Sequence, residues 1–201
     1  YEAALESVTY NNTSDNPNTA NRTISWVVND GDDDSSAVTS TITVAAVNDA
    51  PVTAGASSTL AFTENDGATV IDNSLTITDD DDTNIESATI TISSGFQSAE
   101  DVLAFTDANS ITGSWDASTG VLTLSGSDTI ANYQAALESV TYNNTSDTPN
   151  TANRSISWVV NDGDSDSSAV TSTITVAAVN DAPVLTTPTA GTITENSDAS
   201  T

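Results

Sequence analysis

The chain of 201 residues contains no cysteine, no histidine, no lysine and no methionine. Without cysteine the protein forms no disulfide, and a fold held together by disulfides is excluded. Without thiol or imidazole groups it lacks the usual zinc ligands, a cysteine nucleophile and the histidine base that activates a nucleophile in acyl-transfer enzymes. Without lysine, a covalent cross-link through an ε-amino group is also excluded.

Positive charge is almost absent as well, because Arg22 and Arg154 are the only basic residues beside 29 acidic ones, giving a net charge of −27. Phosphate groups would meet an almost uniformly negative surface, so nucleic-acid binding is excluded. Self-repulsion of this size destabilises a compact state. Ca²⁺ and Mg²⁺ are the natural counter-ions, since both take oxygen ligands. No apolar run approaches the ~18 residues of a membrane span.

A long internal repeat dominates what is present. Residues 1–52 return almost unchanged as residues 133–184. The copies differ at four positions: Glu2/Gln134, Asn16/Thr148, Thr23/Ser155 and Asp33/Ser165. A repeat of 132 residues is the size of one ordinary domain. We therefore expect a window of a longer tandem array, with residues 1–50 ending one repeat, 51–182 forming a complete repeat and 183–201 starting the next.

Within the complete repeat, apolar residues alternate with serine and threonine in short runs. Ile156, Trp158 and Val160 form one such run, and Ile174 and Val176 another. Alternation of this kind is typical of antiparallel strands with one face against a core and one face in water. At least seven such runs predict an all-β fold, a β-sandwich of Greek-key type. We expect Trp26 and Trp158 in the core, whereas neither 1–50 nor 183–201 should bury a core alone.

One segment, TIANYQAALES, breaks the alternation. Ile130, Tyr133 and Leu137 follow each other at i, i+3 and i+7, which predicts a short helix capped near Asp128 or Thr129. Each repeat should therefore carry one short helix.

Acidic side chains recur where strands are predicted to end. The densest group is Asp79 to Asp82, followed by Asn84. The other groups occur twice each: Asn161-Asp162-Gly163-Asp164 with its copy at 29–32, Asn48-Asp49 with Asn180-Asp181, and Glu64-Asn65 with Glu195-Asn196. Asp, Asn and Gly also make ordinary soluble turns, and this alternative stays open for any single group. Four adjacent aspartates favour a cation site, because their repulsion destabilises the fold unless something neutralises it.

These phrases resemble a known family. "LTITDDDDTNIESATITIS", "RSISWVVNDGD" and "STITVAAVNDAPV" are similar to the cadherin-like repeats of very large bacterial surface and secreted proteins, including adhesins. The resemblance covers the whole 132-residue unit. It implies a cadherin- or immunoglobulin-like sandwich repeated in tandem, with Ca²⁺ at the junctions between repeats.

The resemblance also implies metal ligands. Asn48, Asp79, Asp81 and Asp162 would converge at the 48–51 junction. The full set of implied ligands is Asn48, Asp49, Glu64, Asp79, Asp81, Asn84, Asp162, Asp164, Asn180, Asp181 and Glu195. Glu64 and Asp181 would face the 180–183 junction. The linker lacks the family's leading aspartate and second asparagine, and only Asp128 stands where a D-R-E motif belongs. Fewer ligands imply fewer ions and a weak affinity, about 10⁻⁴–10⁻³ M.

The expected function is therefore a structural spacer in a long extracellular adhesin or surface filament of bacterial origin, stiffened by calcium. Its partners would be neighbouring repeats or other copies in a filament, with any ligand-binding region elsewhere. A carbohydrate- or protein-binding module is the alternative, with Trp115 as the best candidate contact. A glycosidase is not expected, because no insertion builds a pocket for a buried acidic pair.

N-x-S/T patterns, the acceptor patterns of N-glycosylation, begin at asparagines 11, 12, 21, 143, 144 and 153. Chance also produces such patterns in a chain rich in Asn, Ser and Thr. Strand exchange between chains instead of a covalent array stays open.

Overall fold

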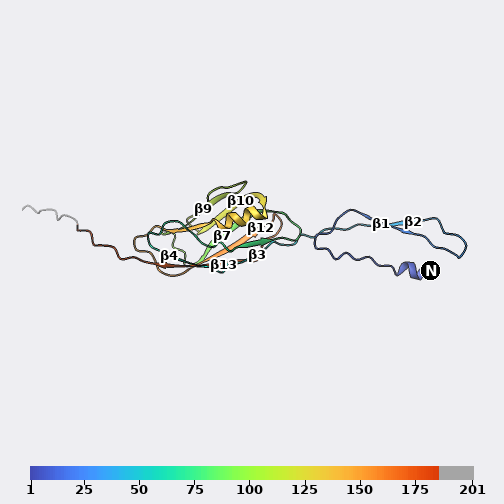
Figure 1. Ribbon diagram of the computed structural model, residues 1–201, viewed down its shortest axis with the longest axis horizontal. Helices are drawn as coiled ribbons and strands as arrows, with labels where there is room; N and C mark the ends of the chain where they lie inside the picture. Colours follow the sequence, from blue (N-terminus) through green and yellow to red (C-terminus); the bar gives the residue numbers. More distant parts are fainter. Residues whose placement is uncertain (186–201) are drawn as a thin grey trace, which may run out of the picture.

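The computed structural model describes residues 1–185, so the predicted ligand Glu195 lies outside the described residues. Residues 51–182 form a layered β body, and residues 1–47 form a separate arm at one end of it (Figure 1). The chain passes from arm to body close to residue 50, where the repeat unit was expected to begin.

Six strands form the main sheet of the body. Their spatial order is β4 (Thr59–Thr63), β13 (Val170–Ala177), β12 (Arg154–Asn161), β7 (Asn84–Ser94), β10 (Val121–Thr129) and β9 (Thr112–Asp116). All neighbours are antiparallel except β4 and β13, which pair in parallel. The sequence pattern predicted antiparallel pairing throughout. The exception arises because β4 and β13 come from opposite ends of the repeat, so no hairpin joins them.

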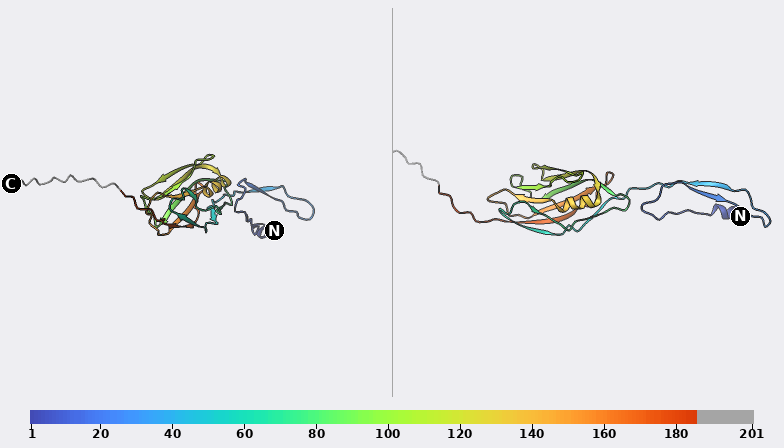
Figure 2. Two further views of the ribbon diagram at one scale, coloured as in Figure 1. Left: turned by 60° about the vertical axis from the view of Figure 1, so that its left-hand side comes forward. Right: turned by 45° about the horizontal axis from the view of Figure 1, so that its top comes forward.

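Smaller sheets cover the other side of the core (Figure 2). One contains β5 (Thr69–Val70), β11 (Thr141–Asn144) and β8 (Asp101–Ala104), and another pairs β3 (Val52–Ala54) with β6 (Thr76–Thr78). Phe62 of β4 and Tyr142 of β11 meet edge to face with ring centroids 5.0 Å apart, so the two layers face each other. This confirms the all-β sandwich. The sequence pattern missed β11, because TYNN is too polar to indicate a strand.

Alternation places the core as predicted. On β12, Ile156, Trp158 and Val160 are buried, whereas the residues that alternate with them, Ser155, Ser157 and Val159, are partly exposed. Trp158 is fully buried, and its Nε1 donates to the Ser172 hydroxyl at 3.0 Å. Arg154 lies on this same face by alternation and is fully buried, although a charged residue was not expected in the core.

The short helix is α2 (Ile130–Glu138). Thr129 is its N-cap, and its hydroxyl accepts a hydrogen bond from the backbone N–H of Asn132 at 3.3 Å. Tyr133 and Leu137 are buried on the face that the i, i+7 spacing predicted. Among residues 1–185, no helix has the length and apolar character needed to cross a bilayer.

The arm contains α1 (Glu2–Glu6), β1 (Arg22–Trp26) and β2 (Val38–Ile42). Arg22 pairs with Ile42, just as Arg154 pairs with Ile174 in the body, so the two hairpins share one register. No residue from 1 to 50 is buried. The prediction that Trp26 lies in a core is wrong within this chain: Trp26 is half-exposed, because residues 1–50 have no opposing layer.

Candidate metal centre

The acidic run follows β6 directly. Carboxylate oxygens of Asp79, Asp81 and Asp82 all lie within 4.8 Å of one another. One oxygen of Asp79 accepts the backbone N–H groups of Asp81 at 3.1 Å and Asp82 at 2.8 Å. This turn folds the run back on itself, which is typical of aspartate after a strand. Three carboxylates are thereby held on one side, while Asp80 is exposed to solvent.

The linker between arm and body closes over this run. The backbone N–H of Asp49 donates to both carboxylate oxygens of Asp81, each at 3.3 Å. The Asn48 side-chain amide donates to a carboxylate oxygen of Asp162 at 3.0 Å and to the Ser165 hydroxyl at 3.2 Å. The structure therefore joins Asn48 to Asp162 and Asp49 to Asp81 across the linker, and the binding of a metal by these residues stays a prediction.

One further contact comes from the arm itself. The side-chain amide of Asn16 donates to the backbone carbonyl of Asp81 at 3.3 Å. Sequence reasoning missed Asn16, although position 16 is one of the four that differ between the copies. The junction is thus held from both the linker and the preceding arm.

Asp162 begins the turn after β12 and is only 7% exposed. Its other carboxylate oxygen accepts the N–H groups of Asp164 at 2.8 Å and Ser165 at 2.6 Å. Burial alone would raise the pKa of Asp162, but the Ser165 N–H, the Asn48 amide and the Asp164 N–H together hold that pKa below its ordinary value. Asp164 contributes its backbone N–H, whereas its side chain is exposed.

The remaining carboxylates repel one another. Desolvation and the neighbouring Asp79 raise the pKa of Asp81 above its usual value, although the Asp49 N–H opposes this. The pKa of Asp82 is also raised, by desolvation and then by the charges of Asp79, Asp81, Asp162 and Glu86. Such repulsion destabilises the loop at neutral pH. A cation among these oxygens would relieve it.

Glu86 on β7 belongs to the same cluster and was missed from the sequence. One of its carboxylate oxygens accepts the Ser127 hydroxyl at 2.9 Å. Its other oxygen and Asp79 Oδ2 are buried without a hydrogen-bond partner among residues 1–185. Glu86 is partly buried near the start of β7, and its charge within a run of Ser, Thr and apolar residues was the signal available in the sequence.

Two expected contributors take other roles. Asn84 is exposed, and its amide donates to the Ser127 hydroxyl at 3.3 Å, so it reaches the cluster only through Ser127. The Asp128 carboxylate accepts the N–H of Ser110 at 2.9 Å and the Asn132 amide at 2.6 Å, which places it at the start of α2. Asp128 thus joins the loop at Ser110 to the Asn132 side chain in the first turn of α2.

The second junction shows one buried carboxylate. Glu64 is 4% exposed, and its Oε2 accepts the Val179 N–H at 2.8 Å. Its Oε1 is buried with no hydrogen-bond partner among the described residues. Asn180 and Asp181 are exposed, and the Asn180 amide donates to the Asp181 carbonyl at 3.1 Å.

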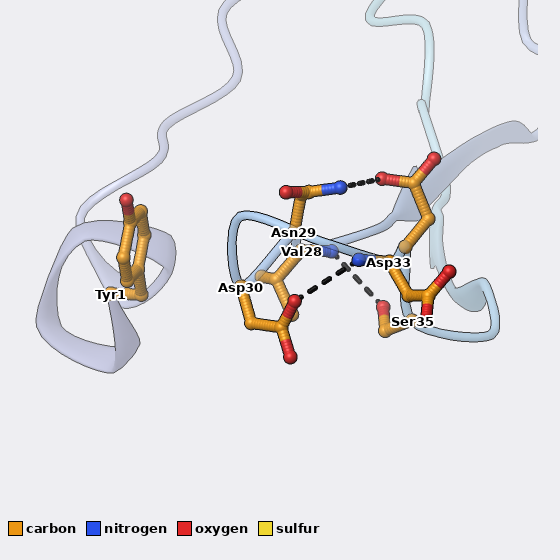
Figure 3. A pocket seen from close by; sticks show the side chains of 7 residues that line it. Tyr1, Val28, Asn29, Asp30, Asp33 and Ser35 are labelled. Atoms are coloured by element: carbon orange, nitrogen blue, oxygen red, sulfur yellow. Dashed lines mark hydrogen bonds between the residues drawn. The ribbon is translucent and has the colours of Figure 1, made fainter.

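A hollow with a volume of about 530 Å³ lies elsewhere, on the arm (Figure 3). Tyr1 and Val28 line it together with the Asn29–Ser35 turn. Their counterparts in the body, Tyr133 and Val160, are both fully buried. The hollow is therefore the core-facing side of the arm, left open because no second layer covers it.

Trp115, the candidate glycan contact, lies on the edge strand β9. It is half-buried against the core and meets Phe96 edge to face with ring centroids 6.2 Å apart. Its Nε1 is buried without a hydrogen-bond partner among residues 1–185. The contact with Phe96 gives Trp115 a packing role, and its role as a glycan contact stays a prediction.

Comparisons with known proteins relate the chain to one long protein. It is similar to Halomucin from Haloquadratum walsbyi, with 44% identity over 86 residues, which is 40% of this chain. The chain spans about 1% of the length of that relative. No family model and no solved structure matches the chain. The relative comes from an archaeon, so the bacterial origin implied by the cadherin-like resemblance stays a prediction.

Proposed function

We propose that this chain is a segment of a long extracellular surface protein, in which each 132-residue repeat acts as a structural spacer. Calcium bound at the junctions would stiffen the array. The duplication, the almost exclusively acidic charge and the similarity to a segment of the very long Halomucin support a spacer over an enzyme. The cation proposal depends on the junction geometry.

The observation that carries the proposal is the contact between the linker and the acidic run. Asn48 reaches Asp162, and Asp49 reaches Asp81, across the boundary between the arm and the body. Two carboxylate oxygens beside these contacts, one on Asp79 and one on Glu86, are buried without a hydrogen-bond partner among residues 1–185. Buried acceptors without donors destabilise a fold unless an ion or water serves them. Oxygen-only ligands of this kind suit Ca²⁺.

Repetition brings a further carboxylate to each junction. Val179, which donates to Glu64, corresponds to Val47 of the first junction. In an array, the Glu64 counterpart of one repeat would therefore stand beside the linker that contacts the next repeat's acidic run. A cation held there would join two repeats directly, and metal binding would couple to junction stiffness.

The test is calorimetric unfolding of the 201-residue chain at constant ionic strength, with chelator and then with 0.1–10 mM calcium. We expect the melting temperature to rise with calcium concentration and then saturate. Each site should contribute roughly 2 kcal/mol to the free energy of unfolding when the calcium concentration is about thirty times its Kd. Asp79→Asn, Asp81→Asn and Asp162→Asn should each weaken this rise. Magnesium at the same concentration should produce a smaller one, because it demands stricter octahedral geometry.

Asp30→Asn provides the matched control. Asp30 is the copy of Asp162 in the arm and accepts the same two backbone N–H groups, but no linker residue contacts it. Its substitution should leave the calcium response intact. A melting temperature that does not change with calcium, or that changes equally in the Asp162 and Asp30 variants, would sink the cation site and leave a metal-free spacer.

A further inference from the structure

The structure separates the N-x-S/T motifs of the body into accessible and inaccessible ones. We propose that Asn153 is an N-glycosylation site, with Asn21 as its counterpart in the arm. Asn153 is exposed in the loop that ends where β12 begins, and Asn21 occupies the same place before β1. Both begin the pattern Asn-Arg followed by Ser or Thr.

The two other motifs in the body do not offer an acceptor amide. Asn144 is buried, and its amide donates to Asp101 at 3.0 Å. Asn143 lies on β11, the central strand of its sheet, and is only partly exposed. A glycan on Asn144 would have to replace its buried hydrogen bond to Asp101, and one on Asn143 would have to stand on the central strand of the small sheet.

Asn153 has no structural role that would explain its presence. Asparagine is usually selected in loops to cap a turn or to adopt positive φ. The neighbouring Asn150 caps its turn by accepting the Ala152 N–H at 2.9 Å, whereas the Asn153 side chain makes no hydrogen bond with residues 1–185. Among residues 1–185, Asn65 and Asn109 are the residues other than glycine with positive φ, so Asn153 does not serve that purpose either.

The backbone at Asn153 is nevertheless fixed in place. A Cβ on Gly95, where φ is +74°, would lie 2.2 Å from the Asn153 carbonyl oxygen, so the two loops approach closely. Arg154, the next residue, is held in the core by Asp101. The Asn153 side chain is thus presented outward from a fixed loop, and the Ser155 hydroxyl makes no hydrogen bond within the described residues.

The difference between the copies preserves the motif. Position 23 is threonine where position 155 is serine, and both residues carry the hydroxyl that N-glycosylation requires two positions after asparagine. In the reaction, Asn153 Nδ2 forms a bond to the anomeric carbon of a sugar carried on a lipid diphosphate. The bond from that carbon to the phosphate oxygen breaks, the lipid diphosphate leaves with the electron pair, and an amide proton is lost to a base.

The position of Asn153 keeps a glycan clear of the metal centre. Asn153 precedes β12 and Asp162 follows it, so the eight residues of β12 separate them by roughly 30 Å. One glycan per repeat would then decorate the array at a fixed period without covering the acidic junction.

The test is peptide mass spectrometry of the protein secreted by its native host, carried out on the wild type and on Asn153→Gln, Ser155→Ala and Ser155→Thr. We expect a glycan mass on the peptide containing Asn153 in the wild type and in Ser155→Thr, and its complete loss in the other two variants. Unchanged melting temperatures of non-glycosylated forms would show that the variants fold. An unmodified Asn153 in the secreted wild type, or a glycan retained in Ser155→Ala, would overturn the proposal. This test is independent of calcium.

Discussion

Arg154 is the residue on which the body's interior most depends. Its guanidinium is fully buried and bonds the Asp101 carboxylate through both Nε and Nη2, at 3.0 Å each, and also donates to the carbonyls of Asn150 and Ala152. Tyr142 donates its hydroxyl to the same carboxylate at 2.7 Å. Burial and this bond to Asp101 raise the Tyr142 pKa well above its ordinary range. Strands β8, β11 and β12 are therefore tied together through one ion pair.

Removing one partner would leave a buried charge uncompensated. Arg154→Ala should therefore lower the free energy of unfolding by about 3–5 kcal/mol. Urea denaturation monitored by tryptophan fluorescence measures this change. Arg22→Ala is the matched control, because Arg22 has nearly the same sequence neighbours, with Thr23 in place of Ser155, but lies in the arm. It should change stability by less than about 0.5 kcal/mol. Equal effects of the two substitutions would contradict the role assigned to the buried pair.

Asp72 carries a second buried carboxylate network and sets a pH dependence. Burial alone would raise the pKa of Asp72, but hydrogen bonds from Ser74, Ser172 and Ser58 outweigh it and hold that pKa below the ordinary value. A lowered folded-state pKa contributes stability that is present above the unfolded pKa of about 3.9 and is lost as pH falls through the folded pKa.

We therefore expect the urea concentration at the unfolding midpoint of the wild type to decrease once the pH drops below about 4. Asp72→Asn should make this decrease smaller. Urea titrations between pH 7 and pH 2.5 measure both. Asp147→Asn, at an exposed position in a loop, serves as the control and should follow the wild-type curve. If Asp72→Asn retained the full acid dependence, the hydrogen bonds to this carboxylate would not be its source.

Among the elements, the hairpin at the end of each repeat, β1–β2 in the arm and β12–β13 in the body, has a register that its own sequence determines. The arm hairpin β1–β2 keeps the register of β12–β13 and repeats its Trp–Ser bond, with Trp26 Nε1 donating to Ser40 at 2.9 Å. It does so without an opposing layer, so turn chemistry and cross-strand pairs fix the register. Burial is different: Tyr1 is 94% exposed, whereas its copy Tyr133 is fully buried.

Deletion of residues 1–46 should accordingly leave the body stable. Only Asn16 and the linker residues contact the acidic run, and exposed hydrogen bonds contribute little to stability. We expect the melting temperature in chelator to change by less than about 3 °C, which corresponds to less than ~1 kcal/mol for a domain of this size. Differential scanning calorimetry provides the measurement, and a large decrease would show that the arm and the body form one cooperative unit.

At the scale of the whole molecule, negative charge is the main force that opposes folding into a compact body. Of the two arginines that oppose 29 acidic residues, Arg154 is buried and ion-paired, so it contributes nothing to the exposed surface. Self-repulsion across the surface should therefore limit stability at low ionic strength. Salt shortens the screening length from about 10 Å at 0.1 M to about 3 Å at 1 M.

Sodium chloride should raise the melting temperature steadily up to molar concentration, without the saturation expected for calcium in the millimolar range. Thermal unfolding of the wild type and of a variant carrying Asp79→Asn, Asp81→Asn and Asp162→Asn separates the two effects. The variant should keep the salt response and lose the calcium response. A melting temperature independent of salt would show that the carboxylates are already neutralised or too far apart to repel.

Periodicity and turn chemistry in the sequence by themselves determined the 132-residue repeat, the all-β class, helix α2 with a cap near Asp128 or Thr129, and the core positions of β12 and β13. These features depend on neighbours within a few residues, which a repeated sequence displays directly. Tertiary structure alone decided that Arg154 pairs with Asp101 inside the core, that Glu86 joins the acidic run, and that Trp158 is buried while its copy Trp26 is not. Pairing and burial depend on residues far away in the chain, so two copies of one sequence differ wherever their surroundings differ.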